Sequence, residues 1–429
     1  MRGPAGSSEQ RNRRFSSRPH AEVHPLPQPL VSTRGRGSTY TGVPVSVVVQ
    51  KYGGSSVADV ERIQRVAARV AETRAQGHQV VVVVSAMGDT TDELLDLARQ
   101  VSPDPHRREL DMLLTAGERI SMALLGMALH ARGVEAVSFT GSQSGIITDG
   151  AHTNARILEV RPVRILEELG KGRVVIVAGY QGVSRDKEVT TLGRGGSDTT
   201  AVALAAALGA EVCEICSDVD GVYTADPRVV PDWQRLSELS PEEMQELALA
   251  GARVLNAQAV EFARDRGIVI HARSTFAPGP GTRIAPRASR ELRISGVAQD
   301  PDLLVVRAED GAALAEVLQK HGAWPRELWL DGPSARLALV PLENVHGAAV
   351  LLDALRGTPG VTVEEGLAQV SIVGSGIGAS RDELSRALRA AQVAPRAVLV
   401  SPLRIALLVP RADAAECVRR LHAEFVGRS

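Results

Sequence analysis

The chain has 429 residues, with 49 Lys and Arg, 50 Asp and Glu and a formal net charge of -1 at pH 7. This length predicts two or three domains, and the balanced charge argues against a nucleic-acid partner. Three cysteines are too few for a disulfide scaffold and indicate a reducing compartment, while no apolar run approaches the ~18 residues that cross a bilayer. We therefore expect a cytoplasmic protein without a membrane segment.

Residues 1–44 are rich in Arg, Ser, Gly and Pro, with seven arginines against Glu9 and Glu22. Such a composition cannot bury a core, so we expect a disordered N-terminal extension. A start of translation further downstream is the alternative, which leaves open whether these residues are translated. The segment lacks the apolar stretch of an ordinary secretory signal.

From Val45 to about Ile284, short apolar runs alternate with helical patterns, which predicts a largely parallel sheet covered on both faces. The predicted strands are Val45–Val49, Val80–Val84, Ala136–Phe139, Arg173–Ala178, Glu211–Ile215 and Ile268–Ala272. The loop Pro278–Gly281 closes this unit, which we place at residues 45–290.

A first candidate phosphate site follows the first strand, where Lys51 leads into Gly53, Gly54 and Ser55 and then into a helix. Glycines let backbone N–H groups approach an anion closely, and the helix aims its positive end at the same point. Lys51 can neutralise phosphate charge. The alternative is that the glycines only form a tight corner between strand and helix.

A second candidate phosphate site has the same design, because Gly195 and Gly196 open an Ala-rich helix that ends at Gly209. Asp198, in the first turn, can organise Lys51 or a metal ion, although an Asp at a helix start is also an ordinary cap. Ser197 can cap equally well.

Ser217, Asp218 and Tyr223, followed by Arg228, lie after a buried strand. The carboxyl ends of parallel strands are where ligands bind in open α/β sheets. A tyrosine ring and a guanidinium suit a nucleotide base and its phosphates. A plain turn built from Asp, Gly and Pro is the competing interpretation.

Two charges point to an amino acid as the second substrate. Glu118 lies in an apolar helix, where an unpaired carboxylate is costly, so it needs a cation such as a substrate ammonium. Arg194, beside the second glycine turn, can bind a carboxylate. An internal ion pair with a nearby arginine is the alternative for Glu118.

The motifs of P-loop enzymes and protein kinases are absent from the sequence. Phosphoryl transfer nevertheless needs mainly positioning and charge neutralisation. Two glycine turns, Lys51 and ATP with bound Mg²⁺ can supply both, so the sequence favours a different kind of kinase.

After Leu292 an internal repeat appears, in which Arg336–Leu339 before Pro341 matches Arg404–Leu407 before Pro410. Each copy also has a helical pattern before and after this strand. Two βαββαβ units explain the repeat, and we place them at residues 291–363 and 364–429. Whether the copies exchange strands, and hence their boundary, stays open.

Several of these segments resemble the aspartate kinase family in order and spacing. They are Lys51–Ser56, Val84–Gly88, Gly117–Glu118, Gly193–Asp198 and Asp218–Arg228. The resemblance implies an amino acid kinase fold, with a mostly parallel sheet sandwiched by helices, followed by two ferredoxin-like ACT domains. It also implies ATP-dependent phosphorylation of the side-chain carboxylate of L-aspartate to 4-phospho-L-aspartate, at the start of lysine, threonine and methionine synthesis.

The resemblance also implies roles for individual residues. Lys51 and Asp198 are then catalytic, and Thr91, Glu118, Arg194 and Ser197 bind aspartate. The implied ATP contacts are Lys51, Gly53, Gly54, Ser55, Ser85, Ser217, Asp218, Tyr223, Arg228 and Arg253. Arg253 stands where the family commonly has lysine, and no residue of this chain is expected to form a dedicated metal site.

The C-terminal units imply a homo-oligomer and a lysine or threonine effector, but the segments that usually meet the effector differ here. The first copy reads Val306–Asp310 and Trp324–Glu327, and the second reads Val393–Arg396 at the matching place. We therefore expect weaker or altered feedback inhibition. A related kinase acting on glutamate, N-acetylglutamate or carbamate, and a non-catalytic amino acid sensor, are the alternative functions.

Overall fold

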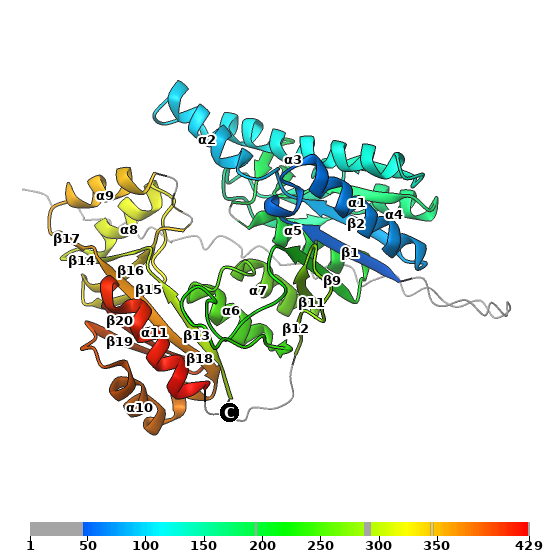
Figure 1. Cartoon of the computed structure of the whole chain (residues 1–429). Helices are drawn as coiled ribbons and strands as arrows, with labels where there is room; N and C mark the ends of the chain where they lie inside the picture. The colour runs from blue at the N-terminus through cyan, green and yellow to red at the C-terminus, as the bar shows by residue number, and fades with distance from the viewer. Residues whose placement is uncertain (1–45, 194, 287–292, 344, 346, 428–429) are drawn as a thin grey trace, which may run out of the picture. The chain divides into compact units, whose positions relative to one another are not determined.

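An eight-stranded sheet organises the first part of the described chain, with strand order β10-β12-β11-β9-β1-β2-β6-β3 (Figure 1). The computed structural model describes residues 46–193, 195–286, 293–343, 345 and 347–427, so the predicted N-terminal extension lies outside it. The strands are β1 (Val47–Tyr52), β2 (Gln79–Val84), β3 (Ala136–Phe139), β6 (Val174–Ala178), β9 (Val212–Ser217), β10 (Glu238–Leu239), β11 (Val269–Ser274) and β12 (Thr282–Ile284). Six of them match the six predicted strands, and every pair among these six is parallel.

Helices cover both faces of this sheet. One face carries α1 (Val60–Ala75) and α3 (Arg107–His130), and the other carries α4 (Val163–Gly170), α5 (Gly196–Leu208), α6 (Pro241–Leu249) and α7 (Ala257–Arg266). The valine run of β2 explains the cover on both faces, because Val81 and Val83 pack with α5 on one face while Val82 packs with α1 on the other. A strand that is apolar on both sides needs cover on both sides. The predicted α/β class is thereby confirmed.

A second, small sheet was not predicted from the sequence. It joins β5 (Ile157–Val160), β4 (Ile146–Thr148), β7 (Gln181–Ser184) and β8 (Val189–Thr191) in that order. Its strands have only three or four residues, too few to show a period of two. Because β7 follows the carboxyl end of β6 after two residues, this sheet lies at the carboxyl edge of the large one.

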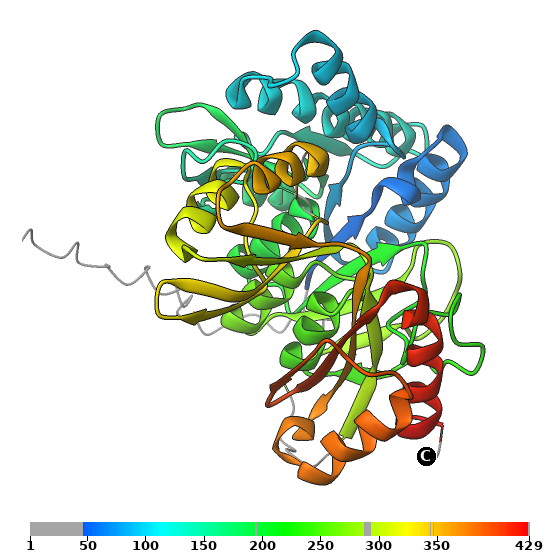
Figure 2. The same ribbon diagram turned by 90° about the vertical axis from the view of Figure 1, so that its left-hand side faces the viewer.

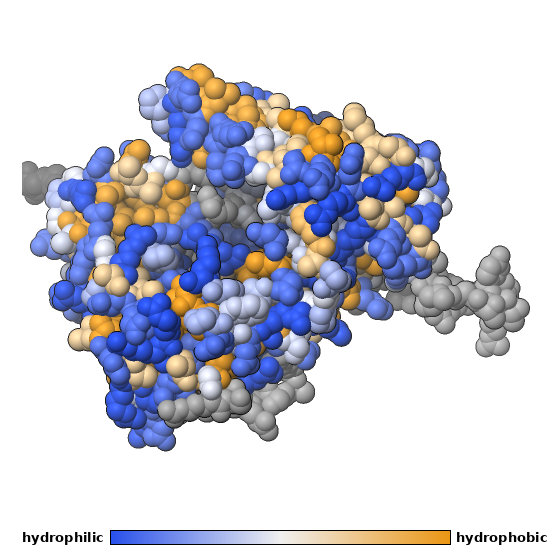
Figure 3. Space-filling model, in the orientation of Figure 1, coloured by the Kyte–Doolittle hydropathy of each residue, from blue (hydrophilic) through white to orange (hydrophobic). Residues whose placement is uncertain are grey.

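The helix α3 is, among the described residues, long and apolar enough by length and composition to span a membrane, which the sequence analysis overlooked. It packs against α1, β3 and β6, and it carries the buried carboxylates of Asp111 and Glu118. Buried carboxylates are costly in lipid but ordinary at a functional site in a protein interior. We therefore interpret α3 as a core helix, although apolar residues show on the surface near α2 (Thr90–Val101) and α3 (Figure 3).

The C-terminal region contains two four-stranded antiparallel sheets, as the repeat predicted. One joins β15 (Glu327–Asp331), β16 (Ser334–Pro341), β14 (Leu303–Ala308) and β17 (Val361–Glu364), and carries α8 (Gly311–Lys320) and α9 (Ala348–Arg356). The other joins β13 (Arg293–Asp300), β18 (Leu367–Ser375), β20 (Arg404–Pro410) and β19 (Ala397–Ser401), and carries α10 (Arg381–Ala391) and α11 (Arg411–Phe425) (Figure 2).

Strand pairing crosses the expected division between residues 363 and 364. The strand β13 lies at the start of the expected first copy, yet it pairs antiparallel with β18 of the second copy over Arg293–Asp300. Within the described residues, which end at 427, no strand follows α11, and β13 occupies the edge of this sheet beside β18. The domain boundaries stay a prediction, but strand exchange between the two copies is now a structural observation.

Ion pairs join this region to the large sheet's helices. The buried Arg404 on β20 lies 3.3 Å from a carboxylate oxygen of Glu246 on α6 and also donates to Glu327 on β15. Asp302, between β13 and β14, pairs with both Arg253 and Arg411 at 2.8 and 3.2 Å. Arg404 and Asp302 each contact two other parts of the chain, so α6 and the turn after it are tied to both C-terminal sheets.

Candidate active site

The expected site residues gather at the carboxyl edge of the large sheet. The loop after β1 is fixed to its neighbours by two backbone hydrogen bonds, from the Gly53 N–H to the Cys216 carbonyl at 3.3 Å and from the Ser85 N–H to the Tyr52 carbonyl at 3.1 Å. Parallel pairing thereby aligns the ends of β1, β2 and β9. Lys51, Ser85 and Ser217 consequently lie on one edge, as the strand pattern predicted.

Lys51 and Asp198 form an ion pair at this edge. The Lys51 Nζ atom lies 2.6 Å from Asp198 Oδ1, and both side chains are largely buried. Asp198 stands in the first turn of α5, whose positive end faces the same point. The contact joins the end of β1 to the start of α5, so the two candidate phosphate sites form one site.

The first glycine turn is closely packed on the loop after β2. A Cβ atom on Gly54 would lie 3.0 Å from the carbonyl oxygens of both Ala86 and Gly88, which are backbone atoms that cannot rotate away. The Gly88 N–H also donates to the Gly54 carbonyl at 3.1 Å. Gly54 therefore lets two loops of the site touch, and Gly53 precedes the short helix η1 (Gly54–Val57) without any side-chain cap.

We predict that Gly54→Ala lowers kcat about tenfold or more, because the added methyl separates the two loops at a cost of ~1–3 kcal/mol. Steady-state rates and circular dichroism of the folded variant check this. Gly170→Ala is the matched control, since a Cβ there meets nothing within 4 Å. Equal rates for the two variants would contradict the prediction.

The second glycine turn has a left-handed backbone at Gly195. Gly195 precedes α5 with φ +75° and offers no side-chain cap. Ser197 is buried beside Gly179, where an added Cβ would lie 2.7 Å from the Ser197 Oγ atom. The Gly196 and Asp198 N–H groups donate within this turn, to the Gly193 and Gly195 carbonyls at 3.0 Å each. Arg194, the predicted aspartate ligand, lies outside the described residues.

Glu118 is 3% exposed and lies against the loop after β2. Its Oε1 atom accepts a hydrogen bond from the Ala86 N–H at 3.1 Å, whereas Oε2 is buried without a hydrogen-bond partner. Burial raises the pKa of this carboxyl to about 7, against which the hydrogen bond from Ala86 works only partly. No ion pair within the described part of the chain reaches Glu118, so the alternative of an internal arginine partner finds no support there.

The remaining residues of the predicted aspartate and phosphate sites occupy the surrounding loops. Thr91 is half-buried in the first turn of α2, directly after the loop that Gly54 anchors. The Ser55 carbonyl accepts a hydrogen bond from Arg62 of α1. Among the described residues, neither Thr91 nor Ser55 forms a hydrogen bond or ion pair with Glu118 or Lys51, so their roles stay predictions.

The predicted nucleotide segment forms an ordered loop beyond β9. The Tyr223 ring stacks at a tilt on Trp233, with ring centroids 4.4 Å apart, and its hydroxyl donates to Asp220. The Ser217 Oγ atom lies 3.4 Å from the Val219 nitrogen, and Asp218 is exposed. This loop therefore starts at the carboxyl edge, as a nucleotide site requires.

Two predicted ATP ligands point elsewhere in this structure. The Arg228 side chain is 88% exposed and pairs with Asp226 at 2.7 Å. Arg253 pairs with Asp302, outside the kinase fold. Asp226 lies only two residues before Arg228, whereas Asp302 is 49 residues from Arg253, and each arginine has to leave its partner before it can contact a nucleotide.

The sequence analysis missed two polar groups near the site. Asp111 is fully buried on α3, where it accepts from Thr191 and from the Thr153 N–H and contacts His152 at 2.6 Å. Burial raises the pKa of the Asp111 carboxyl. The signal that singled out Glu118, a carboxylate in an apolar helix, applied equally to Asp111. The second group is Asn256, whose N–H donates to Asp198.

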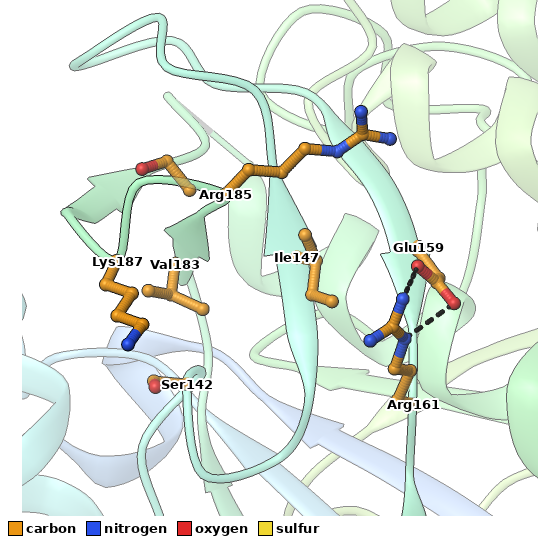
Figure 4. A pocket seen from close by; sticks show the side chains of 8 residues that line it. Ser142, Ile147, Glu159, Arg161, Val183, Arg185 and Lys187 are labelled. Carbon is orange, nitrogen blue, oxygen red and sulfur yellow. Dashed lines mark hydrogen bonds and ion pairs between the residues drawn. The ribbon is translucent and has the colours of Figure 1, made fainter.

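A separate pocket of about 500 Å³ lies on the small sheet and contains none of the predicted residues (Figure 4). Its lining includes Ser142, Arg161, Arg185 and Lys187, and Arg161 is paired with Glu159 at 2.7 Å. The pocket is distinct from the Lys51–Asp198 site because the two share no residue.

The comparisons with known proteins agree with this geometry. Residues 46–274 match the amino acid kinase family. The chain is 46% identical over 410 residues to an aspartokinase of Mycolicibacterium smegmatis, covering 89% of this chain and 96% of that protein. The chain belongs to the aspartokinase family. It is therefore a phosphotransferase of amino-acid biosynthesis that phosphorylates aspartate, and the family suggested by the sequence motifs is confirmed.

Solved structures of Escherichia coli aspartokinase III share the fold. Its complex with aspartate and ADP has a TM-score of 0.76 and 25% identity, and covers 88% of this chain and 99% of that one. Its complex with lysine and aspartate has a TM-score of 0.70 and 25% identity over 89% and 99% of the two chains. The likeness extends through the two C-terminal sheets, in accord with the predicted ACT units.

Proposed function

We propose that the Lys51–Asp198 site transfers the γ-phosphoryl group of ATP to the side-chain carboxylate of L-aspartate. The observation that carries this proposal is the 2.6 Å contact between Lys51 and Asp198, because it joins both glycine turns into one anion site. An aspartate oxygen attacks the γ-phosphorus, the bond to the β–γ bridging oxygen breaks, and ADP leaves with that electron pair. The attacking carboxylate is already ionised, so the step needs no base.

Each part of the site has a task in this reaction. Lys51 and the positive end of α5 after Gly195 neutralise phosphate charge, and Gly53 and Gly54 let the backbone after β1 approach the phosphates. Glu118 binds the ammonium group of aspartate, and Arg194 binds its α-carboxylate, with Ser197 and Thr91 beside them. Asp198 holds Lys51 in place. The loop from Ser217 to Tyr223 binds the nucleoside, joined by Arg228 and Arg253 when these leave their carboxylate partners.

Mg²⁺ fits this site as an ion held mainly by the phosphates of ATP. Within the described ranges, no cluster of three or more His, Cys, Asp or Glu side chains can hold a metal ion. Mg²⁺ commonly keeps one or two protein carboxylates beside phosphate oxygens and water, and Asp198 is a carboxylate at the right place. The ion would neutralise charge on the transferred group.

A hydroxylamine trap for acyl phosphate tests the proposed function directly. The purified chain is incubated with ATP, Mg²⁺ and L-aspartate, and the hydroxamate is measured against reactions with L-glutamate or N-acetyl-L-glutamate. We expect product with aspartate alone, because an acetylated amine cannot pair with Glu118. Hydroxamate from N-acetylglutamate, or none from any acceptor, would refute the proposal.

We further propose that the chain forms a homo-oligomer through the exposed edge of its first C-terminal sheet. The edge strand β15 exposes three consecutive apolar residues, Leu328, Trp329 and Leu330, and Trp324 is exposed just before it. An exposed apolar edge strand invites pairing with another chain. An effector such as lysine or threonine would act on such an interface, and rate titrations with both amino acids test our expectation of weaker or altered inhibition.

We also propose that the enzyme acts in the cytoplasm, where its three free, buried cysteines stay reduced.

We predict that Trp329→Lys shifts the oligomer to monomer, because the new charge would have to be buried at the edge. Light scattering coupled to size exclusion at several protein concentrations measures this. Leu158→Lys on β5 is the control, since Leu158 is exposed on a strand away from this edge. An unchanged mass for the Trp329 variant would show that β15 is not the interface.

A further inference from the structure

Asn256 occupies an unusual place, because it connects three parts of the site. It precedes α7, and its Oδ1 atom accepts hydrogen bonds from the Gln258 and Ala259 N–H groups at 2.9 and 3.1 Å. Its own N–H donates to Asp198 Oδ2 at 3.3 Å. A side-chain cap of this kind fixes the backbone of the capping residue. The cap therefore also fixes the N–H that Asp198 accepts.

The Asn256 side chain also lies directly against the second glycine turn. A Cβ atom on Gly195 would come within 2.2 Å of Asn256 Nδ2, so the turn can approach only because Gly195 lacks a side chain. Gly195 and Asn256 are thus packed together at the start of α5 and of α7. The two helix starts converge on the Asp198 carboxylate, and their positive ends stabilise its negative charge.

The segment before Asn256 is fixed from the other side as well. A Cβ atom on Gly251, which has φ +107°, would lie 2.1 Å from the Gln299 carbonyl of β13. Arg253 is held by Asp302, and Leu255 is buried. The turn from Gly251 to Asn256 is therefore packed at both ends, so Asn256 is placed by the protein frame and not by a ligand.

We propose that Asn256 is a positioning residue for phosphoryl transfer, which sets the Asp198 carboxylate, and through it Lys51, by capping α7. The inference rests on the proposed function, in which Lys51 and Asp198 act on the phosphates. One oxygen of Asp198 faces Lys51 and the other faces the Asn256 N–H, so the carboxylate is held from two sides. A carboxylate held in this way keeps the lysine in line without reorganisation during the reaction.

The decisive test compares N256D, N256S and N256A. Asn, Asp and Ser cap helices about equally well, so N256D and N256S preserve the cap and should melt within about a degree or two of the parent. N256D, however, adds a carboxylate beside Asp198 and the glycine turn. We expect N256S to keep kcat within twofold, and N256D to lower kcat about 10- to 100-fold with KM for aspartate unchanged. N256A should lower both the melting temperature and kcat.

A cap removed far from the site provides the matched control. Ser380 caps α10 by accepting from the Glu383 N–H at 3.3 Å. S380A should lower the melting temperature about as much as N256A while leaving kcat at the parental value. If lost stability alone lowers kcat, both S380A and N256A should be slower than the parent. If Asn256 positions Asp198, only N256A should be slower.

The outcomes separate this inference from the proposed function. If N256A keeps the parental kcat, or if N256S loses as much activity as N256A, the positioning role is overturned. D198N is measured beside them. A slow D198N with a fast N256A overturns only the role of Asn256, whereas a fast D198N overturns the proposed function itself.

Discussion

Lys51→Met should lower kcat by at least about 10²- to 10³-fold, the cost of removing one preorganised donor from a charged transition state. The substitution also leaves the Asp198 carboxylate without its cation, 2.6 Å from where the ammonium had been. That carboxylate then repels the phosphates. KM for aspartate should change little, because the ammonium of aspartate is assigned to Glu118, on a different helix.

Hydroxamate rates at saturating ATP and aspartate measure this effect, and circular dichroism establishes that the variant is folded. Lys171→Met is the matched control, because Lys171 is an exposed lysine that also pairs with a carboxylate, Glu168 at 2.7 Å. We expect the control to keep the parental rate. A Lys51 variant that is as fast as this control would show that the Lys51–Asp198 site is not the catalytic one.

Glu118→Gln should raise KM for aspartate about 10- to 100-fold, because a hydrogen bond to a charged partner contributes ~1.5–3 kcal/mol. Glutamine has the same shape and keeps an oxygen for the Ala86 N–H, so the fold and KM for ATP should be preserved. Glu109→Gln on the same helix is the control, since Glu109 is exposed and faces Arg108. An unchanged KM for aspartate in the Glu118 variant would remove this residue from the substrate site.

The raised pKa of Glu118 gives this prediction a pH dependence. Below about pH 7 the free protein holds Glu118 largely protonated, and a neutral carboxyl does not attract an ammonium group. KM for aspartate should therefore fall as the pH rises toward about 7 and then level off. In Glu118→Gln the same plot should be flat in this range, and a parallel fall in both proteins would assign the effect to another group.

The same carboxyl should also act on stability, in a direction set by its raised pKa. In the unfolded chain its carboxyl has the ordinary glutamate pKa of 4.5, whereas burial in the folded protein raises that pKa to about 7. The free energy of unfolding is therefore not reduced by this group below about pH 4.5. It falls by up to ~3 kcal/mol as the pH rises from about 4.5 to 7, because the unfolded chain ionises the carboxyl first. Urea unfolding at pH 5 and pH 8 should therefore show Glu118→Gln gaining relative to its parent at the higher pH.

Much of the sheet was predictable because its strands bury both faces. Val80 to Val84 form a run of five fully buried valines, and such a run reads as a central strand in any context. Glu118 was predictable for a related reason, since an apolar helix makes any carboxylate conspicuous. The small sheet was not predictable, because strands such as Ile146–Thr148 are too short to carry a pattern.

The partners of the charged residues could not be predicted, because they lie far away in the sequence. Arg253 was expected at the nucleotide, yet it pairs with Asp302 in the turn between β13 and β14. The pairing of β13 with β18 in the second C-terminal sheet was also unpredictable, since the residues Arg293–Asp300 carry no local pattern that indicates which strand they pair with.

The sequence by itself determined the two glycine turns, the lysine beside the first and the carboxylate after the second, because backbone freedom and burial are local properties of the chain. Only the tertiary structure decided that Lys51 and Asp198 meet, and that Asn256 holds Asp198 from the other side. These contacts depend on how α5 and α7 pack on the sheet. Packing of that kind is the sum of many weak, long-range contacts that no single segment encodes.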